Sequence, residues 1–93
     1  MYPAVVRDVA FVVQTASFHR DIHTALAEAH PLITSVTLFD VFEGKNVGEG
    51  KKSMAYRITY QSPEKTLETA ENDEAHKAVE KILKEKFKAE IRK

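Results

Sequence analysis

The strongest constraint on the fold is a strict alternation of polar and apolar side chains over residues 53–61. A period of two is typical of a β-strand that buries one face and leaves the other accessible. Apolar and aromatic residues share the inward face: Met54, Tyr56, Ile58 and Tyr60. Smaller or polar residues share the outward face: Ser53, Ala55, Arg57 and Thr59. We therefore expect a sheet with one covered side and one open side.

Three further segments are predicted as strands, over 5–13, 34–42 and 89–91. Alternation in the first separates inward from outward residues: Val9, Phe11 and Val13 against Asp8, Ala10 and Val12. In the second, Val36 and Leu38 favour one face, whereas Phe39 and Val41 favour the opposite one. A β-bulge near Phe39-Asp40 would let both pairs reach the core.

Apolar residues at helical spacing predict two helices, over 18–29 and 70–87. Ser17 is the expected N-cap of the first, and His30-Pro31 ends it. The order of elements predicts an α+β fold of the ferredoxin-like βαββαβ type, in which two helices cover one face of a four-stranded antiparallel sheet. At 93 residues the chain forms a single domain, 1–93.

The composition narrows the function classes. Fourteen Lys and Arg residues balance fourteen Asp and Glu residues, so the net charge is zero at pH 7. A nucleic-acid binder that acts alone is more often basic, so we expect weak RNA binding by the isolated domain. The absence of cysteine excludes disulfides, thiolate metal sites and a cysteine nucleophile. The absence of cysteine also suits a reducing compartment, so we expect a cytoplasmic location, and a mitochondrial matrix fits equally well. No apolar run approaches the roughly 20 residues that span a bilayer, so we expect no membrane partner.

The loop over residues 43–52 is the first candidate site, because it holds three glycines and three lysines behind the aromatic Phe42. A ring for stacking, mobile cations and free backbone N–H groups are what proteins offer to single-stranded nucleic acid. Small outward residues on the strands at 5–13 and 53–61 leave a shallow surface over which a base could lie. Because none of them is aromatic, the stacking mode of RNA-recognition motifs is disfavoured. Two plainer interpretations stay open: a buried strand-end ring for Phe42, and a merely solvated loop for Lys45, Lys51 and Lys52.

Other chemistry has little support. The loop is not a phosphate-binding P-loop, because Gly44 to Gly50 is one residue too long and a strand follows it. His19 and His23 stand at helical spacing i and i+4, but no third metal ligand is evident, so we interpret them as surface histidines. His76 flanks the core, and no spacing of nucleophile and base suggests catalysis in this domain.

Short motifs run in order along nearly the whole chain: Tyr2-Pro3 with Arg7-Asp8, Ser35-Val36, Leu38 to Gly44, Gly50 to Ala55, Lys65-Thr66-Leu67 and His76. Together they resemble the C-terminal ferredoxin-fold anticodon-binding domain of the phenylalanyl-tRNA synthetase β chain. The resemblance implies a non-catalytic recognition domain, excised from the C-terminus of a larger β chain. Its implied partners are the anticodon loop of tRNA-Phe, the remainder of the β chain, and the α chain of an (αβ)₂ enzyme. ATP and magnesium are implied for that parent ligase, and no cofactor for this domain.

The resemblance also implies roles for single residues. Phe42 holds the position where the family usually has a tyrosine that stacks on the first anticodon base, so the ring is kept and the hydroxyl is lost. Ala10 and Ser53 match positions that lie against that base, and alternation independently places both on the open face. Supporting contacts are implied at Arg7, Asp8, Asp40, Lys52 and Arg57. Lys51 and Lys52 are expected to attract phosphates.

A protein-interaction module is the alternative, because an open sheet face with Ala10, Val12 and Ala55 could also dock a partner domain. Salt separates the two functions, since RNA binding weakens steeply with ionic strength and apolar docking does not. A small-ligand regulatory domain is a third possibility, but no converging polar pocket is evident in the sequence.

Overall fold

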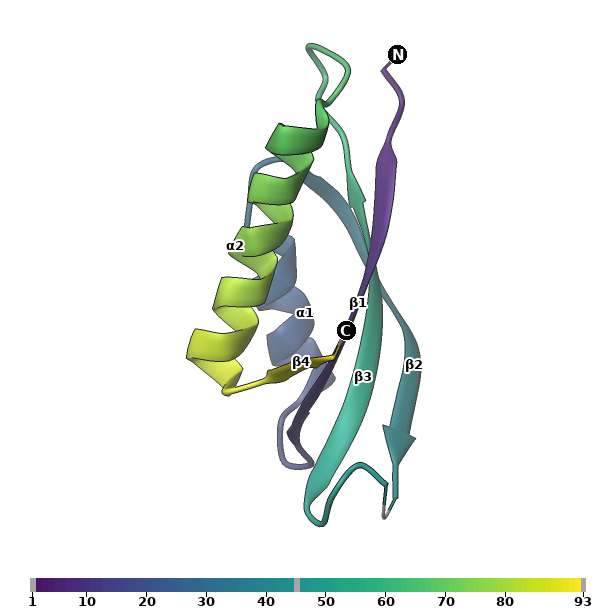
Figure 1. Ribbon diagram of the computed structural model, residues 1–93, viewed down its shortest axis with the longest axis vertical. Helices are drawn as coiled ribbons and strands as arrows, with labels where there is room; N and C mark the ends of the chain where they lie inside the picture. The colour runs from purple at the N-terminus through teal and green to yellow at the C-terminus, as the bar shows by residue number, and fades with distance from the viewer. Residues whose placement is uncertain (1, 45, 93) are drawn as a thin grey trace.

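Six elements follow one another in the computed structural model, which describes residues 2–44 and 46–92. They are β1 (Val5–Gln14), α1 (His19–Ala27), β2 (Ile33–Glu43), β3 (Lys51–Tyr60), α2 (Thr69–Phe87) and β4 (Glu90–Arg92). The strands form one antiparallel sheet in the order β2-β3-β1-β4. Both helices lie on one face of the sheet and leave the other face open (Figure 1). The predicted ferredoxin-like architecture is confirmed.

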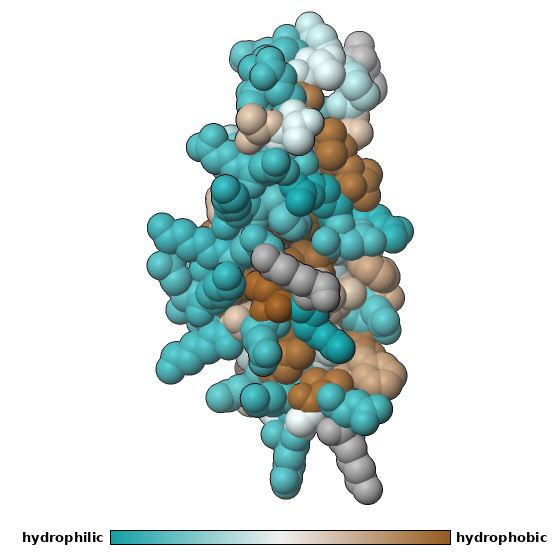
Figure 2. All heavy atoms as spheres, viewed as in Figure 1, coloured by the Kyte–Doolittle hydropathy of each residue, from teal (hydrophilic) through white to brown (hydrophobic). Residues whose placement is uncertain are grey.

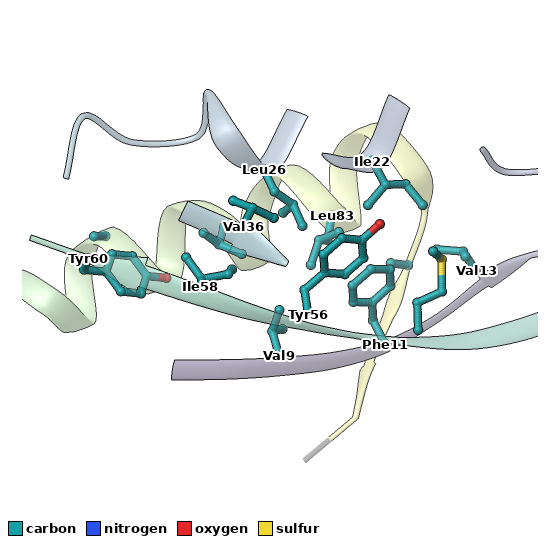
Figure 3. Packing of buried hydrophobic residues seen from close by; sticks show 14 of the residues in the cluster. Val9, Phe11, Val13, Ile22, Leu26, Val36, Tyr56, Ile58, Tyr60 and Leu83 are labelled. Carbon is teal, nitrogen blue, oxygen red and sulfur yellow. The ribbon is translucent and has the colours of Figure 1, made fainter. Parts of the chain in front are cut away.

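The core lies between the sheet and the two helices (Figure 3). The inward residues predicted for β1 and β3 are all at most 4% exposed: Val9, Phe11, Val13, Met54, Tyr56, Ile58 and Tyr60. The rings of Phe11 and Tyr56 stack with their centroids 5.8 Å apart. Ile22 and Leu26 of α1 and Leu83 of α2 close the core from the helix side. Burial of each such aliphatic side chain stabilises the fold by about 1.5–3 kcal/mol.

The predicted β-bulge in β2 is confirmed, because the pairing of β2 with β3 shifts between Leu38 and Asp40. A second shift follows Ile33. The extra residue between Leu38 and Asp40 is Phe39. It reverses the faces to which the later side chains of β2 point. Without it, Asp40 and Phe42 would share the helix-facing side with Leu38. With it, they face the open side of the sheet.

The expectation that the bulge brings both apolar pairs into the core is wrong. Val36 is buried and Leu38 is partly buried, but Phe39 and Val41 are each 48% exposed. Val41 does lie on the helix-facing side, opposite the buried Met54. However, β2 is an edge strand of the sheet, so Val41 has a neighbouring strand on one side only and stays half exposed. Phe39 instead contacts a side chain on the open face.

α1 is shorter at both ends than the predicted range of 18–29. The expected N-cap at Ser17 is wrong, because Phe18 takes that position and its carbonyl accepts the amide of Ile22 at 3.2 Å. Ser17 lies in the preceding turn, where its amide donates to the carbonyl of Gln14 at 2.9 Å. Phe18 consequently projects away from the core and is 67% exposed.

α2 begins and ends close to the predicted limits of 70–87. At its start the side chain of Glu71 accepts the amide of Glu68 at 3.3 Å, which satisfies one N-terminal donor. At its end Lys88 adopts a left-handed conformation with φ 53° and turns the chain into β4. The surface over α2 is mostly hydrophilic, and hydrophobic residues appear toward the sheet side (Figure 2). Within the described residues, neither helix is long and apolar enough to cross a membrane.

Candidate nucleic-acid interface

The open face is built from aligned rows of side chains on β2, β3 and β1. In one row, Phe42 lies opposite Ser53, and Ser53 lies opposite Val12. In the next row, Asp40 lies opposite Ala55, and Ala55 lies opposite Ala10. Neighbouring strands are about 4.8 Å apart, and rows on one face are about 7 Å apart. Small residues on the two central strands therefore form a shallow floor between larger side chains.

Phe42 stands at the edge of this floor with 55% of its surface exposed. The alternative that its ring is a buried strand-end residue is therefore excluded. The β-bulge at Phe39 is the physical reason, because it turns Phe42 to the same face as Ser53 and Ala10. An exposed ring beside small side chains leaves room for a second flat group to stack against it.

Arg57, Asp8 and Phe39 form a cluster at the far end of the floor. Arg57 donates from Nε to Asp8 Oδ1 at 3.0 Å and from Nη2 to Asp8 Oδ2 at 3.4 Å. Its Cζ lies 4.8 Å from the centroid of the Phe39 ring. The carboxylate of Asp8 raises the pKa of Arg57, so the guanidinium stays charged and paired. Phe39 was not predicted as a site residue, because the bulge was expected to bring it into the core; its alternation with the core-facing Leu38 was the signal that could have indicated its exposure.

The two described lysines of the loop have different surroundings. Lys52 lies opposite Val13 on the helix-facing side, and its Nζ donates to the carbonyl of Ser17. Lys51 is exposed at the hairpin end of β3, beside a hollow of about 530 Å³ lined also by Gly44 and Gly50. Lys45 lies outside the described residues. Lys51 is thus better placed than Lys52 to contact a ligand on the open face.

Arg7 lies on the opposite side of the sheet from the floor. Its Nη1 donates to Asp73 Oδ1 at 2.9 Å and to Asn72 Oδ1 at 3.2 Å, and both acceptors belong to α2. Arg7 and Asp8 are neighbours on a strand, so the sequence already indicated that they face opposite sides of the sheet. Arg7 was expected among the supporting contacts only because the resemblance implied it. The structure does not bring Arg7 together with Ala10, Phe42 and the other open-face residues.

The histidines occupy structural positions at the margin of the core. A hydrogen bond of 2.6 Å joins His19 Nδ1 to the Tyr56 hydroxyl, and His23 Nε2 donates to the carbonyl of Val36 at 2.9 Å. His76 is buried, and its Nδ1 shares a hydrogen bond of 2.8 Å with the Tyr60 hydroxyl. Among residues 2–44 and 46–92, no three His, Cys, Asp or Glu side chains are grouped so that they could hold a metal ion.

Comparison with known proteins identifies the family. Residues 1–92 match the ferredoxin-fold anticodon binding domain. The chain is 43% identical to the phenylalanine–tRNA ligase β subunit of Bacillus cereus and 37% identical to that of Oceanobacillus iheyensis, with 99% and 98% of the chain covered. The β subunit of Anaeromyxobacter dehalogenans is 43% identical over 97% of the chain. In each case the chain spans only 11–12% of the relative's length. With its fold and a match over nearly its whole length, the chain belongs to the family of ferredoxin-fold anticodon binding domains.

Proposed function

We propose that this domain binds the anticodon loop of tRNA-Phe as an appended recognition domain of a phenylalanine–tRNA ligase β subunit. The observation that supports this most directly is the exposed ring of Phe42 beside the small side chains of Ser53 and Ala10. A base can lie on the floor of small residues while its face stacks on the ring. Stacking of one base on an aromatic side chain contributes roughly 1–3 kcal/mol.

Polar groups around the floor complete the proposed site. Asp40 lies opposite Ala55 and can accept hydrogen bonds from the edge of a base. Lys51 supplies a mobile positive charge for a neighbouring phosphate. Because the chain has no net charge, few phosphates can be neutralised, and binding by the isolated domain should be weak. Lys52 and Arg7 contribute by holding the sheet to the helix side rather than by touching RNA.

The parent protein supplies what this domain lacks. We infer that the domain is a C-terminal piece of a larger β chain, which works with an α chain in an (αβ)₂ ligase of the cytoplasm. The relatives, of whose length this chain spans 11–12%, support this arrangement. ATP and magnesium would serve the ligation reaction of that parent enzyme, in parts of it other than this domain.

Phe42→Ala tests the proposed function. The labelled domain is titrated with a tRNA-Phe anticodon stem-loop (GAA) at low salt, and backbone amide shifts are followed by NMR. Phe42→Ala should weaken binding by about 1–3 kcal/mol, or roughly 5- to 150-fold, whereas Phe42→Tyr should bind as well as the wild type. Phe18→Ala is the matched control, because it removes another exposed ring, at the N-cap of α1 and away from the floor. Equal affinities of the wild type and Phe42→Ala would remove Phe42 from the site.

Protein docking is the second candidate, because Phe39, Val41 and Phe42 give β2 an exposed apolar strip at the edge of the sheet. The same titration distinguishes the two functions. Amide shifts near Ala10 and Lys51 that weaken with added salt would support RNA binding. If the wild-type domain shows no shifts at millimolar RNA, and neither does the complete β chain, docking of a partner protein becomes the better explanation.

A further inference from the structure

Three side chains next to the proposed base site contact one another on the open face, although these contacts add little to the stability of the sheet. Phe39, Arg57 and Asp8 come from three different strands, and each is about half exposed. An exposed ion pair between Arg57 and Asp8 contributes only about 0–1 kcal/mol by itself. The ring of Phe39 lies on the open face, where it packs under the guanidinium of Arg57.

The contacts fix the orientation of the guanidinium. The forked pair of hydrogen bonds to Asp8, at 3.0 Å and 3.4 Å, restrains Arg57 from one side. The Phe39 ring, 4.8 Å from Arg57 Cζ, restrains it from the other. A guanidinium that is already ordered loses little conformational entropy when a ligand stacks on it. Because Asp8 neutralises its charge, Arg57 is a poor point charge for phosphate but keeps its flat surface.

The position of this cluster relates it to the first site. Along β3 the open face presents Ser53, Ala55 and Arg57 in succession, at intervals of about 7 Å. The floor that receives the first base therefore ends where the guanidinium begins. Unstacked bases of single-stranded RNA are commonly held on aromatic rings and on arginine guanidinium planes. Both kinds of surface are present here, next to the floor.

We infer that Phe39, Arg57 and Asp8 form a second base-stacking position, for the nucleotide that adjoins the one held by Phe42. This inference rests on the proposed function. Asp8 orients Arg57, and the guanidinium and the Phe39 ring provide the stacking surface. The domain would then bind two neighbouring bases of a single strand, one on each side of the small-residue floor.

Two variants separate stacking from charge. Arg57→Lys keeps the positive charge and can still reach Asp8, but it removes the flat guanidinium. Phe39→Leu keeps an apolar side chain but removes the ring. Arg20→Lys on α1 is the matched control, because it makes the same chemical change away from the open face. Each protein is titrated with the intact GAA stem-loop and with two versions in which one neighbour of the first anticodon base is an abasic ribose.

The wild type should lose about tenfold in affinity with one of the two abasic loops. Arg57→Lys and Phe39→Leu should bind the intact loop about tenfold more weakly and should lose nothing further with that abasic loop. A structural role alone would not produce this coupling to one base. The second position is refuted if Arg57→Lys binds the intact loop like the wild type. It is also refuted if the abasic site weakens binding by the variants as much as it weakens binding by the wild type, so that the two fold-losses of affinity multiply.

The outcome for Phe42 keeps the two proposals distinguishable. A domain in which Phe42→Ala weakens binding and Arg57→Lys does not would retain the proposed function and lose only the second position. A domain in which neither substitution changes the affinity would contradict both. Thermal melts of each variant establish that the fold is intact, so that a loss of binding reports the contact rather than unfolding.

Discussion

Two tyrosines on β3 allow a matched test of how burial determines the worth of a hydrogen bond. Tyr56 and Tyr60 are both fully buried, and burial raises the pKa of each hydroxyl to about 12. The Tyr60 hydroxyl pairs with His76, which is itself buried, at 2.8 Å. The Tyr56 hydroxyl pairs with His19, which faces water, at 2.6 Å. We therefore expect Tyr60→Phe to destabilise the domain more than Tyr56→Phe does.

The magnitudes follow from what happens to each partner. In Tyr56→Phe, the ring nitrogen of His19 can bond to water, so the loss is that of an ordinary hydrogen bond, about 1 kcal/mol. In Tyr60→Phe, Nδ1 of His76 is left without a partner in a dry environment, which costs about 2 kcal/mol. The difference of about 1 kcal/mol corresponds to about 4–8 °C in Tm for a domain of this size.

Urea and thermal unfolding of the two variants measure this difference. The double variant Tyr60→Phe/His76→Leu is the internal control, because replacing both partners by apolar groups of similar shape is nearly neutral. It should be more stable than Tyr60→Phe alone. The reasoning is refuted if the two single variants lose equal stability, or if the double variant loses more than Tyr60→Phe.

Two further outcomes concern acid sensitivity and the loop. Burial, assisted by the positive charge of Arg7 and opposed by Glu80 and Asp73, lowers the pKa of His76 in the folded state. The unfolded chain then binds a proton more readily, so the free energy of unfolding should fall as the pH drops below about 6.5. Urea melts between about pH 8 and pH 5 should show a smaller fall in His76→Leu, and equal slopes would contradict the assignment. Gly50 has φ 74° and open space where a Cβ would lie, so a substitution there meets backbone strain and no steric clash. Gly50→Ala should therefore destabilise the domain by about 1 kcal/mol, and Gly50→Asn by less. Thermal melts in which Gly50→Ala matches the wild type would argue against this.

The faces of the sheet could be predicted from alternation because burial on a strand repeats every second residue. Val9 and Phe11 of β1 and Tyr56 and Ile58 of β3 are buried as predicted. The bulge near Phe39 was also predictable, since no regular strand could satisfy both apolar pairs of β2. These features depend on neighbouring residues only, which is why a single sequence contains them.

Features that depend on distant elements could not be predicted. The exposure of Val41 follows from the edge position of β2, and nothing in residues 33–43 reports which strand lies at the edge of the sheet. The N-cap of α1 is Phe18 and not Ser17, because Ser17 belongs to the turn after β1. There its amide bonds to Gln14, and its carbonyl accepts from Lys52 of β3. For the site, alternation placed Ala10 on the open face, whereas the contact between Phe39 and Arg57 appears only when β2 and β3 are paired.

The sheet order has a consequence for how the domain folds. The first strand of the chain lies inside the sheet, where Ala10 pairs with Ala55 on one side and with Arg92 on the other. The pairing with Arg92 joins segments from nearly opposite ends of the chain, and folding dominated by such long-range pairings is slower than that of a helical domain of equal size. Because the open face needs β2, β3 and β1 in register, it forms only once these distant segments have met. The helices contribute no side chain to this face, so its appearance during folding would report the assembly of the sheet.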